Sequence, residues 1–293
     1  MRVLSQEDKA FWEENGYVIV KNAVPQENLD AMVQAIWDFL EVDGSDLEDW
    51  YRHRPRERND ESDMSPISIA GMVEMYQHQA IWNNRQHPRV YGAFADIWGR
   101  DDLWVTLDRV NMKPPIREQN PEWDHPGMIH WDVDTSQDQV PFGVQGVLYL
   151  TDTAEDQGGF QCVRGFHNTF DSWVKTQPED RNPRIPDLDG LTVEAIAGEA
   201  GDLLIWHHLL AHGNGHNRSA VPRLAQYISM GPAAHFEARE ARVSSWREVR
   251  PMSRWPGDRR GWEAAHYGPA ELTELGEKLL GVKAWERSGR GDR

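Results

Sequence analysis

Apolar positions at the start of the chain follow a helical pattern, then a strand pattern, then a helical pattern again. Ser5 suits a helix N-cap and Gly16 suits a helix end, so we expect a helix over roughly residues 6–14. The run of β-forming residues at 17–20 predicts a short strand. Pro25 suits the first position of a second helix. Apolar residues recur in this second helix at the helical period, at Leu29, Met32, Val33, Ile36, Trp37 and Leu40.

From about residue 104 the pattern changes to short runs of β-forming residues separated by glycine and proline turns. Strands are predicted over residues 104–112, 141–150, 160–163, 191–196, 203–206, 209–212 and 223–230. The run 141–150 has apolar residues on both faces, which indicates a strand buried on both sides. Many short strands between such turns are typical of an antiparallel sandwich or barrel of jelly-roll type. We therefore expect a mainly β fold with flanking helices.

The chain is expected to form a single domain over residues 1–293 in three parts. Residues 1–100 are predicted to be mostly helical support, 101–235 to form the jelly-roll core with a metal site, and 236–293 to form a helical extension. Within the first part, residues 41–63 carry nine acids and four arginines, which indicates a solvated insertion. A plain exposed loop is the favoured interpretation of this insertion, and a lid over an active site is the alternative.

Two later segments are also expected at the surface. Residues 171–190 contain several prolines and few apolar side chains, so they predict a surface excursion of the same domain. Six arginines lie between Arg242 and Arg260, ahead of a helix predicted over 271–280 and a charged tail. We expect these arginines to form a solvated or subunit-contacting face, with a local anion-binding surface as the alternative.

Composition narrows the choice of partner. The formal net charge is −17, which disfavours nucleic acid and anionic membrane surfaces because phosphates are bound by clustered Lys and Arg. The chain has no apolar run of membrane-spanning length, and its polar start shows no signal-peptide core. Cys162 is the only cysteine, which fits a reducing compartment. We expect a cytoplasmic monomer or homodimer that acts on a small molecule, with a few of the fourteen tryptophans walling its pocket.

The triplet His130-Trp131-Asp132 is the strongest chemical signal. In an extended strand over residues 128–133, His130 and Asp132 would leave the same face, with Trp131 packing on the other side. A buried strand does not readily accept an unpaired carboxylate, so Asp132 would need a cation. His212 follows a Gly-Asp turn and a strand, and would supply a third ligand. Two histidines and one carboxylate suit iron(II) and leave positions for a chelating cosubstrate and dioxygen, although zinc accepts the same ligands.

A candidate anion anchor lies eleven residues beyond His212, at Arg223. Arg223 begins a β-like segment, and a buried arginine there needs an anion, which its planar guanidinium can bind as a carboxylate. Three other histidines compete as the third ligand: His207, His208 and His216. His212 is preferred because its spacing to Arg223 fits and because a loop histidine would be held less rigidly. Trp206 and His125 are further candidates to line the pocket.

These motifs together resemble the phytanoyl-CoA dioxygenase family of iron(II)- and 2-oxoglutarate-dependent oxygenases. The resemblance covers roughly residues 5–235 and rests on the segments E-E-N-G-Y-V-I-V, H-W-D, T-D-T-x-x-x-x-G-G, V-R-G-F-H, G-D-L-L-I-W and H-G-N-G-H-N-R-S-A-V-P-R. It implies a double-stranded β-helix core of the cupin-like kind. The family usually has P-G-S-H where this chain has V-R-G-F-H, so Val163, Arg164 and Gly165 are expected to reshape the substrate side.

The resemblance also implies roles for individual residues. His130, Asp132 and His212 would hold iron(II), and Arg223 would receive the distal carboxylate of 2-oxoglutarate. Lys113 and Gln145 would lie near that cosubstrate, by a looser correspondence.

The implied enzyme is a dioxygenase that hydroxylates a C–H bond of a small molecule, such as a natural-product intermediate. Because Asp132 supplies the carboxylate ligand, hydroxylation, desaturation or ring formation is favoured over halogenation. The alternative function is a non-oxidative metal-binding barrel, either a zinc hydrolase or a ligand sensor.

Overall fold

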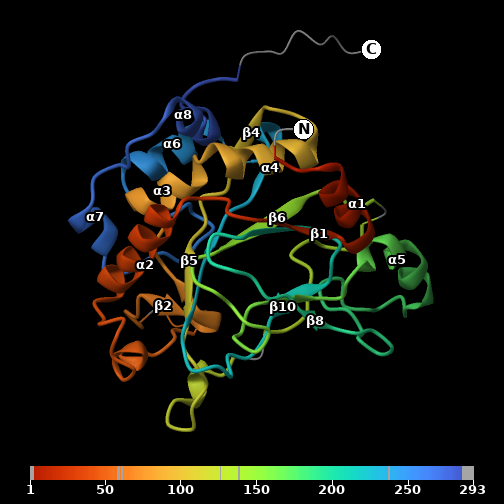
Figure 1. The fold of residues 1–293 in the computed structure, drawn as a ribbon, viewed down its shortest axis with the longest axis horizontal. Helices are drawn as coiled ribbons and strands as arrows, with labels where there is room; N and C mark the ends of the chain where they lie inside the picture. Colours follow the sequence, from red (N-terminus) through yellow and green to blue (C-terminus); the bar gives the residue numbers. More distant parts are fainter. Residues whose placement is uncertain are drawn as a thin grey trace.

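A computed structural model describes residues 3–57, 60, 62–125, 127–137, 139–236 and 238–285, arranged around one large antiparallel sheet (Figure 1). The order of strands in this sheet is β1-β9-β6-β11-β5-β3-β2. Its strands are β1 (Tyr17–Val20), β2 (Ile67–Ser68), β3 (Met72–Val73), β5 (Val110–Lys113), β6 (Val144–Tyr149), β9 (Leu203–His207) and β11 (Arg223–Tyr227). Two smaller sheets, β10-β7-β8 and β12-β4, complete the β structure of the described residues.

The N-terminal elements form where the sequence predicts them. Helix α1 (Gln6–Asn15) starts with a capping box in which the Ser5 hydroxyl accepts the amide N–H of Asp8, and it ends at Gly16 with φ 76°. Strand β1 follows directly and pairs with β9. Helix α2 comprises Gln26–Leu40, so Pro25 is its N-cap and not its first helical residue, a one-residue difference from the prediction.

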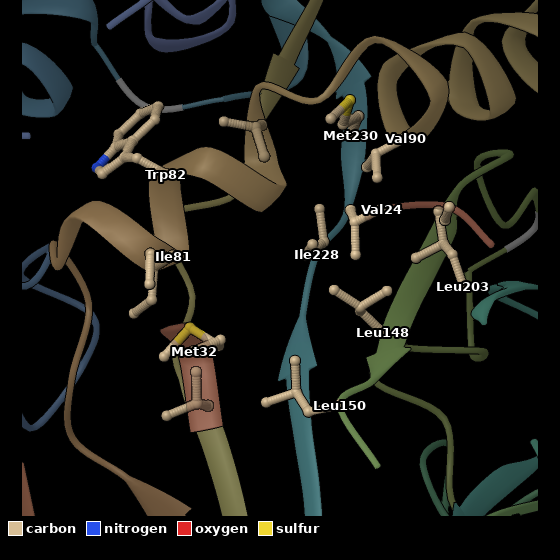
Figure 2. Packing of buried hydrophobic residues seen from close by; sticks show 14 of the residues in the cluster. Val24, Met32, Ile81, Trp82, Val90, Leu148, Leu150, Leu203, Ile228 and Met230 are labelled. Atoms are coloured by element: carbon tan, nitrogen blue, oxygen red, sulfur yellow. The ribbon is translucent and has the colours of Figure 1, made fainter. Parts of the chain in front are cut away.

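Helices cover one face of the large sheet. They are α2, α3 (Gln79–Arg85), α4 (Pro88–Trp98), α6 (Arg239–Arg247), α7 (Trp262–His266) and α8 (Glu274–Leu280). Short 3-10 turns add η1 (Asp49–Tyr51), η2 (Ile69–Gly71), η3 (Pro121–Trp123), η4 (Val174–Thr176) and η5 (Ala233–His235). Figure 2 shows part of the shared core, in which Met32 of α2 and Ile81 of α3 lie near Leu148 of β6 and Ile228. None of the described helices combines the length and the apolar content that crossing a bilayer requires.

The opposite face of the large sheet packs against the small sheet β10-β7-β8. The small sheet consists of β7 (Phe160–Cys162), β8 (Glu194–Ala195) and β10 (His212–Asn214). Tyr149 and Trp206 from the large sheet share a buried cluster with Phe160 and Cys162 from the small one. Strand β6 is buried along most of its length between these layers, as its apolar sequence predicts. The jelly-roll fold class expected from the sequence is confirmed.

Several strand predictions are wrong in detail. The run 223–230 contains β11 and the start of a separate strand at Met230, and these two strands belong to different sheets. Residues 104–112 form two strands, β4 (Leu103–Val105) and β5, which belong to different sheets; β4 pairs with β12 (Met230–Pro232). The break falls at a polar turn, where the Asp108 carboxylate accepts the amide N–H of Arg109. The strand expected over 209–212 is a turn that ends at His212, where β10 begins.

Helix α5 (Phe166–Trp173) was not predicted, since its first residues belong to the V-R-G-F-H motif. It lies beside the small sheet (Figure 1), and its Phe166 and Phe170 pack against Trp131.

The acidic insertion is largely exposed but is attached at two points. Trp50 is buried, and the Tyr51 hydroxyl donates a hydrogen bond of 2.5 Å to the carbonyl of Pro115. Arg56 is also buried and lies 3.8 Å from the Glu74 carboxylate. Part of the insertion, residues 58, 59 and 61, lies outside the described residues, as does the charged tail from 286 onward.

The expectation of a solvated face holds for three of the six arginines between Arg242 and Arg260. Arg247, Arg250 and Arg254 are exposed, whereas Arg242, Arg259 and Arg260 contact the protein. Arg242 is fully buried and donates to the carbonyls of Leu279, Leu280 and Val105. Arg259 and Arg260 donate to main-chain carbonyls of Asp60 and Phe39. The physical reason is that backbone carbonyls at the ends of helices and strands need donors, and a guanidinium can serve several at once. Arg242, Arg259 and Arg260 therefore attach the C-terminal extension to the N-terminal half.

We expect Arg242→Ala to lower the free energy of unfolding by about 3 kcal/mol, because it leaves buried carbonyls without donors and opens a cavity. Arg247→Ala on the same helix is the matched control, since Arg247 is exposed. Denaturant unfolding followed by circular dichroism measures both. Equal stability of the two variants would show that the buried contacts of Arg242 do not hold the extension.

Candidate metal centre

One antiparallel bridge joins the two segments that carry the candidate ligands. The amide N–H of His130 donates to the carbonyl of His212 at 2.8 Å, and the amide N–H of His212 donates back at 3.1 Å. The strand expected over 128–133 is reduced to this single bridge, and the chain bends at Asp132. The bend, in place of strand alternation, brings the Asp132 carboxylate beside the two imidazoles.

Two glycines permit this close approach of backbones. A Cβ atom at Gly127, where φ is 50°, would lie 1.4 Å from the carbonyl oxygen of Asn214. A Cβ atom at Gly213 would lie 2.7 Å from the carbonyl oxygen of Met128. Side chains at either position would push the ligand loop away from β10.

The three side chains converge with their ligand atoms free. Nε2 of His130 lies 3.5 Å from Oδ1 of Asp132, and Nε2 of His212 lies 3.5 Å from Oδ2. One ligand atom from each of the three residues lies within 4.8 Å of the others. The Nδ1 atoms lie 2.8 Å and 2.9 Å from the carbonyls of Met128 and Leu210 respectively, so each Nδ1 must carry the proton. This tautomer leaves both Nε2 lone pairs available to a metal ion.

Asp132 is the charged member of the site. Its side chain is 52% exposed, whereas the sequence predicts a carboxylate in a buried strand. Partial burial would raise the pKa of Asp132, but His130, His212 and Gln145 lower it more, so that the pKa lies well below its usual range. The Gln145 amide donates to Oδ2 at 2.6 Å. The carboxylate is therefore ionised at neutral pH, which is the form that binds a cation.

The triad opens into a cavity of about 1000 Å³ that also contains Arg223. Arg223 is 1% exposed, and its Nη1 donates to Oδ1 of Asn111 at 2.9 Å. Its Nε and Nη2 atoms are buried and meet no acceptor within the described part of the chain. Such a guanidinium, desolvated and incompletely hydrogen-bonded, fits a planar carboxylate. The structure thus brings Arg223 and the triad together in one cavity.

Gln145 and Lys113 have different positions relative to the cavity. Gln145 lines it and contacts Asp132. Lys113 pairs with Arg223 across β5 and β11, but its Nζ donates to the carbonyls of His125 and Gly215 at 2.8 Å and 2.6 Å. Burial and the nearby Arg223 lower the pKa of Lys113 to about 8. The Lys113 side chain therefore links the segments that contain His125 and Gly215. Lys113 is not among the described residues that line the cavity.

The competing histidines lie outside the triad. His208 lines the cavity, and burial lowers its pKa to about 4, so it is neutral at pH 7. His207 packs against Phe142, with ring centroids 5.2 Å apart. His216 pairs with the Asp124 carboxylate.

The aromatic predictions are confirmed in part. Trp206 lines the cavity, but His125 is not among its described lining residues. Trp131 is buried on the far side of the ligand loop, as predicted, and its Nε1 donates to the carbonyl of Leu209 at 3.0 Å. Arg164 pairs with Glu194 at 3.1 Å and, like Val163 and Gly165, is not among the described residues that line the cavity.

One contact of the ligand loop was missed by sequence reasoning. Arg184, in the proline-rich segment 171–190, donates from its guanidinium to the main-chain carbonyl of Asp132. The carbonyl of Arg184 in turn accepts the amide N–H of Trp131 at 2.8 Å. Both segments are irregular, so no hydrophobic periodicity could have revealed that they lie side by side.

Comparisons with known proteins agree with this geometry. The sequence model of the family described as phytanoyl-CoA dioxygenase (PhyH) matches residues 12–225. A Dictyostelium discoideum protein named after that family is 24% identical over 265 residues, which cover 76% of this chain and 74% of the relative. An ectoine dioxygenase of Nocardia farcinica is 22% identical over 233 residues, covering 74% of each chain.

A solved structure shares the fold. It is the epimerase SnoN in complex with Fe3+, alpha ketoglutarate and nogalamycin RO, with a TM-score of 0.55 and 18% identity. The match covers 78% of this chain and 83% of that one. At this identity the likeness concerns the fold.

We expect Asp132→Ala to weaken binding of a divalent metal ion by at least about a hundredfold, because the only carboxylate of the triad is lost. His216→Ala is the control, since His216 lies outside the triad and pairs with Asp124. Anaerobic calorimetric titration with iron(II) or manganese(II) measures both affinities. A wild-type affinity in Asp132→Ala would mean that the ion binds elsewhere.

Proposed function

Because the chain belongs to the phytanoyl-CoA dioxygenase family, we propose that His130, Asp132 and His212 hold an iron(II) ion that uses 2-oxoglutarate and dioxygen to oxidise a small molecule. The protein is a 2-oxoglutarate-dependent non-haem iron dioxygenase, and hydroxylation of a C–H bond is its proposed reaction. One observation carries this assignment of the site. A two-histidine, one-carboxylate ligand set shares its cavity with a buried arginine, some of whose N–H groups find no acceptor in the described part of the chain.

The residues present fit both groups. Two imidazoles and one carboxylate on one side of an ion leave positions for other ligands, which is the arrangement that suits iron(II). The Nε and Nη2 atoms of Arg223 supply two donors for the distal carboxylate of 2-oxoglutarate. Asn111 holds the third nitrogen of this guanidinium and so fixes the direction of the donors.

When bound, iron(II) supplies the activation of dioxygen, coupled to conversion of 2-oxoglutarate to succinate and carbon dioxide, that oxidises an otherwise unreactive C–H bond. The protein side chains bind the metal ion and the cosubstrate, orient the ligands and exclude water from the site. The carbonyls of Met128 and Leu210 orient the two imidazoles, and Gln145 orients the Asp132 carboxylate.

Aromatic rings shield the inner histidine. The ring of Trp206 lies 5.0 Å and that of Phe160 5.9 Å from the His212 ring, measured between centroids. Both rings line the cavity, so water is displaced from the side of the site that faces the core.

The carboxylate of Asp132 bears on the type of oxidation. Because this residue fills the third ligand position, the site has no vacated place for a chloride ion. We therefore propose hydroxylation, or a related desaturation or ring closure, in preference to halogenation.

The alternative assignment, a zinc hydrolase or a ligand sensor, uses the same triad. It leaves Arg223 unexplained, since a hydrolase has no need of a buried carboxylate anchor beside its metal. The N–H groups of Arg223 that meet no acceptor among the described residues support the oxygenase.

Three further expectations complete the proposal. A cavity of about 1000 Å³ supports a small-molecule substrate. The buried free thiol of Cys162 and the need to keep iron reduced support a cytoplasmic setting. Pairing of β1 with β9, together with the contacts of Arg242 between the C-terminal extension and β4, supports a single domain.

We expect Arg223→Gln to weaken 2-oxoglutarate binding to the manganese-loaded, anaerobic protein by about ten- to a hundredfold, because charge-assisted hydrogen bonds are lost. Metal affinity should not change, since Arg223 is not a ligand. Calorimetry measures both constants, and Arg164→Gln, an arginine not among the cavity-lining residues, is the control. Unaltered 2-oxoglutarate affinity in Arg223→Gln would favour the non-oxidative alternative.

A further inference from the structure

Building on the proposed function, we propose that Arg109 and Trp255 form a second anion-binding pole in the same cavity, which holds a carboxylate or similar anionic group of the substrate. The substrate class that follows is an organic acid with an aromatic or alicyclic body. The proposal rests on the position of Arg109, on its unsatisfied donors and on the charge of the cavity wall.

The position of Arg109 follows from the strand register. Arg223 pairs with Lys113, and the amide N–H of Tyr227 donates to the carbonyl of Arg109 at 3.1 Å, so the ladder continues to Arg109. Arg109 directly precedes β5 and lies four residues before Lys113, so in extended backbone the two side chains leave the same face, with about 3.3 Å per residue. The two arginines therefore begin from backbone levels roughly 13 Å apart.

The two guanidiniums have different partners. Arg223 donates to Asn111, whereas Arg109 donates to the Tyr76 hydroxyl and lies 3.8 Å from the Glu74 carboxylate. In the proposal, 2-oxoglutarate occupies the triad and Arg223, and Arg109 holds another group. Both arginines line the cavity.

Contacts with neighbouring side chains hold the Arg109 guanidinium in place, but they do not satisfy all of the nearby N–H donors. Its guanidinium carbon lies 4.5 Å from the centre of the Trp255 ring, and its Nη1 donates to the Tyr76 hydroxyl at 3.2 Å. The Glu74 carboxylate is 3.8 Å away and is also shared with Arg56 and the Tyr76 hydroxyl. Within the described residues, Nε of Arg109 and Nε1 of Trp255 are buried with no acceptor. Two stacked N–H donors without partners indicate a missing acceptor.

The charge of the cavity wall favours an anion. Outside the triad, the charged side chains among the described lining residues are Arg109, Arg184, Arg223, Arg254, Asp108 and Asp134. Four positive side chains face two negative ones, and burial raises the pKa of the Asp108 carboxyl. After 2-oxoglutarate pairs with Arg223, an excess of positive charge remains for the substrate.

The other residues that line the cavity indicate the chemical nature of the rest of the substrate. Aromatic side chains line the cavity in addition to Trp255, at Trp98, Phe142, Phe160, Trp206 and Phe236. Flat rings of this kind pack well against aromatic or alicyclic ligands. The shared chemistry is therefore an apolar ring system carrying one anionic group.

The test uses wild-type protein loaded with manganese(II) and saturating 2-oxoglutarate without oxygen. The probes are naphthalene-2-acetate and its neutral analogue naphthalene-2-acetamide. We expect the acid to bind at least about tenfold more tightly than the amide, because a charge-assisted hydrogen bond is gained. The acid, and not the amide, should shift the indole N–H resonance of Trp255, which is assigned from Trp255→Phe.

Two variants localise the effect. Arg109→Gln should reduce the preference for the acid to less than about twofold while 2-oxoglutarate binds as in the wild type. Trp255→Phe keeps the ring but removes one donor, so it should lower the preference partially, and it supplies a second readout if Arg109→Gln fails to fold. Arg164→Gln is the control.

The proposal is overturned if the acid shows no saturable binding, if acid and amide bind alike, or if both variants retain the wild-type preference. Failure of the proposed function would give a different result, because the wild-type protein would then not bind 2-oxoglutarate. An acid preference that depends on Arg109 but appears only in Arg223→Gln would also overturn the proposal, because the acid would then compete for the cosubstrate anchor.

Discussion

The pair of main-chain hydrogen bonds between His130 and His212 is the constraint on which the site depends. It joins two segments some eighty positions apart and fixes two of the three ligands at the same level. Neighbouring residues allow the two backbones to lie this close. Gly127 and Gly213 have no side chains that would separate them, and Trp131 attaches the loop to the carbonyl of Leu209 on the far side. Segment 171–190 closes the arrangement through Arg184. Main-chain hydrogen bonds therefore fix this short irregular loop on two sides, to β10 and to segment 171–190.

Buried arginines show how one residue type serves two purposes in this fold. Arg242 has backbone carbonyls for its donors and joins elements that are distant in sequence. Arg223 and Arg109 retain donors that meet no acceptor in the described protein, and both face the cavity. Desolvating a guanidinium is costly unless its N–H groups are satisfied. Arg56 and Arg85 also keep a buried nitrogen without an acceptor among the described residues, but neither lines the cavity. The position on the cavity wall therefore marks Arg223 and Arg109 as suited to a ligand.

Sequence patterns correctly predicted the elements that depend on local periodicity. They failed at positions where contacts between distant segments determine the backbone conformation. The capping of α1, the buried strand β6 and the class of fold follow from residue spacing. The break at Asp108 and the bend at Asp132 do not, because single polar contacts interrupt otherwise β-like runs. Arg109 lies within the predicted strand 104–112, so the sequence pattern did not identify it as a residue of the cavity. The charge density of the C-terminal arginines predicted a solvated face, which holds for Arg247, Arg250 and Arg254. It fails for Arg242, because the sequence does not show which buried carbonyls need a donor.

The parts of the cavity come from different stretches of the chain. The triad and Arg223 lie within residues 12–225, which the family shares, whereas Trp255 belongs to the extension beyond them. The proposed substrate pole is therefore shared between the two regions, with Arg109 inside the matched residues and Trp255 outside them. Inherited changes in the extension can alter which molecules are admitted while the oxidising apparatus stays intact, and exchanging this segment between relatives is a route to new selectivities on an unchanged scaffold.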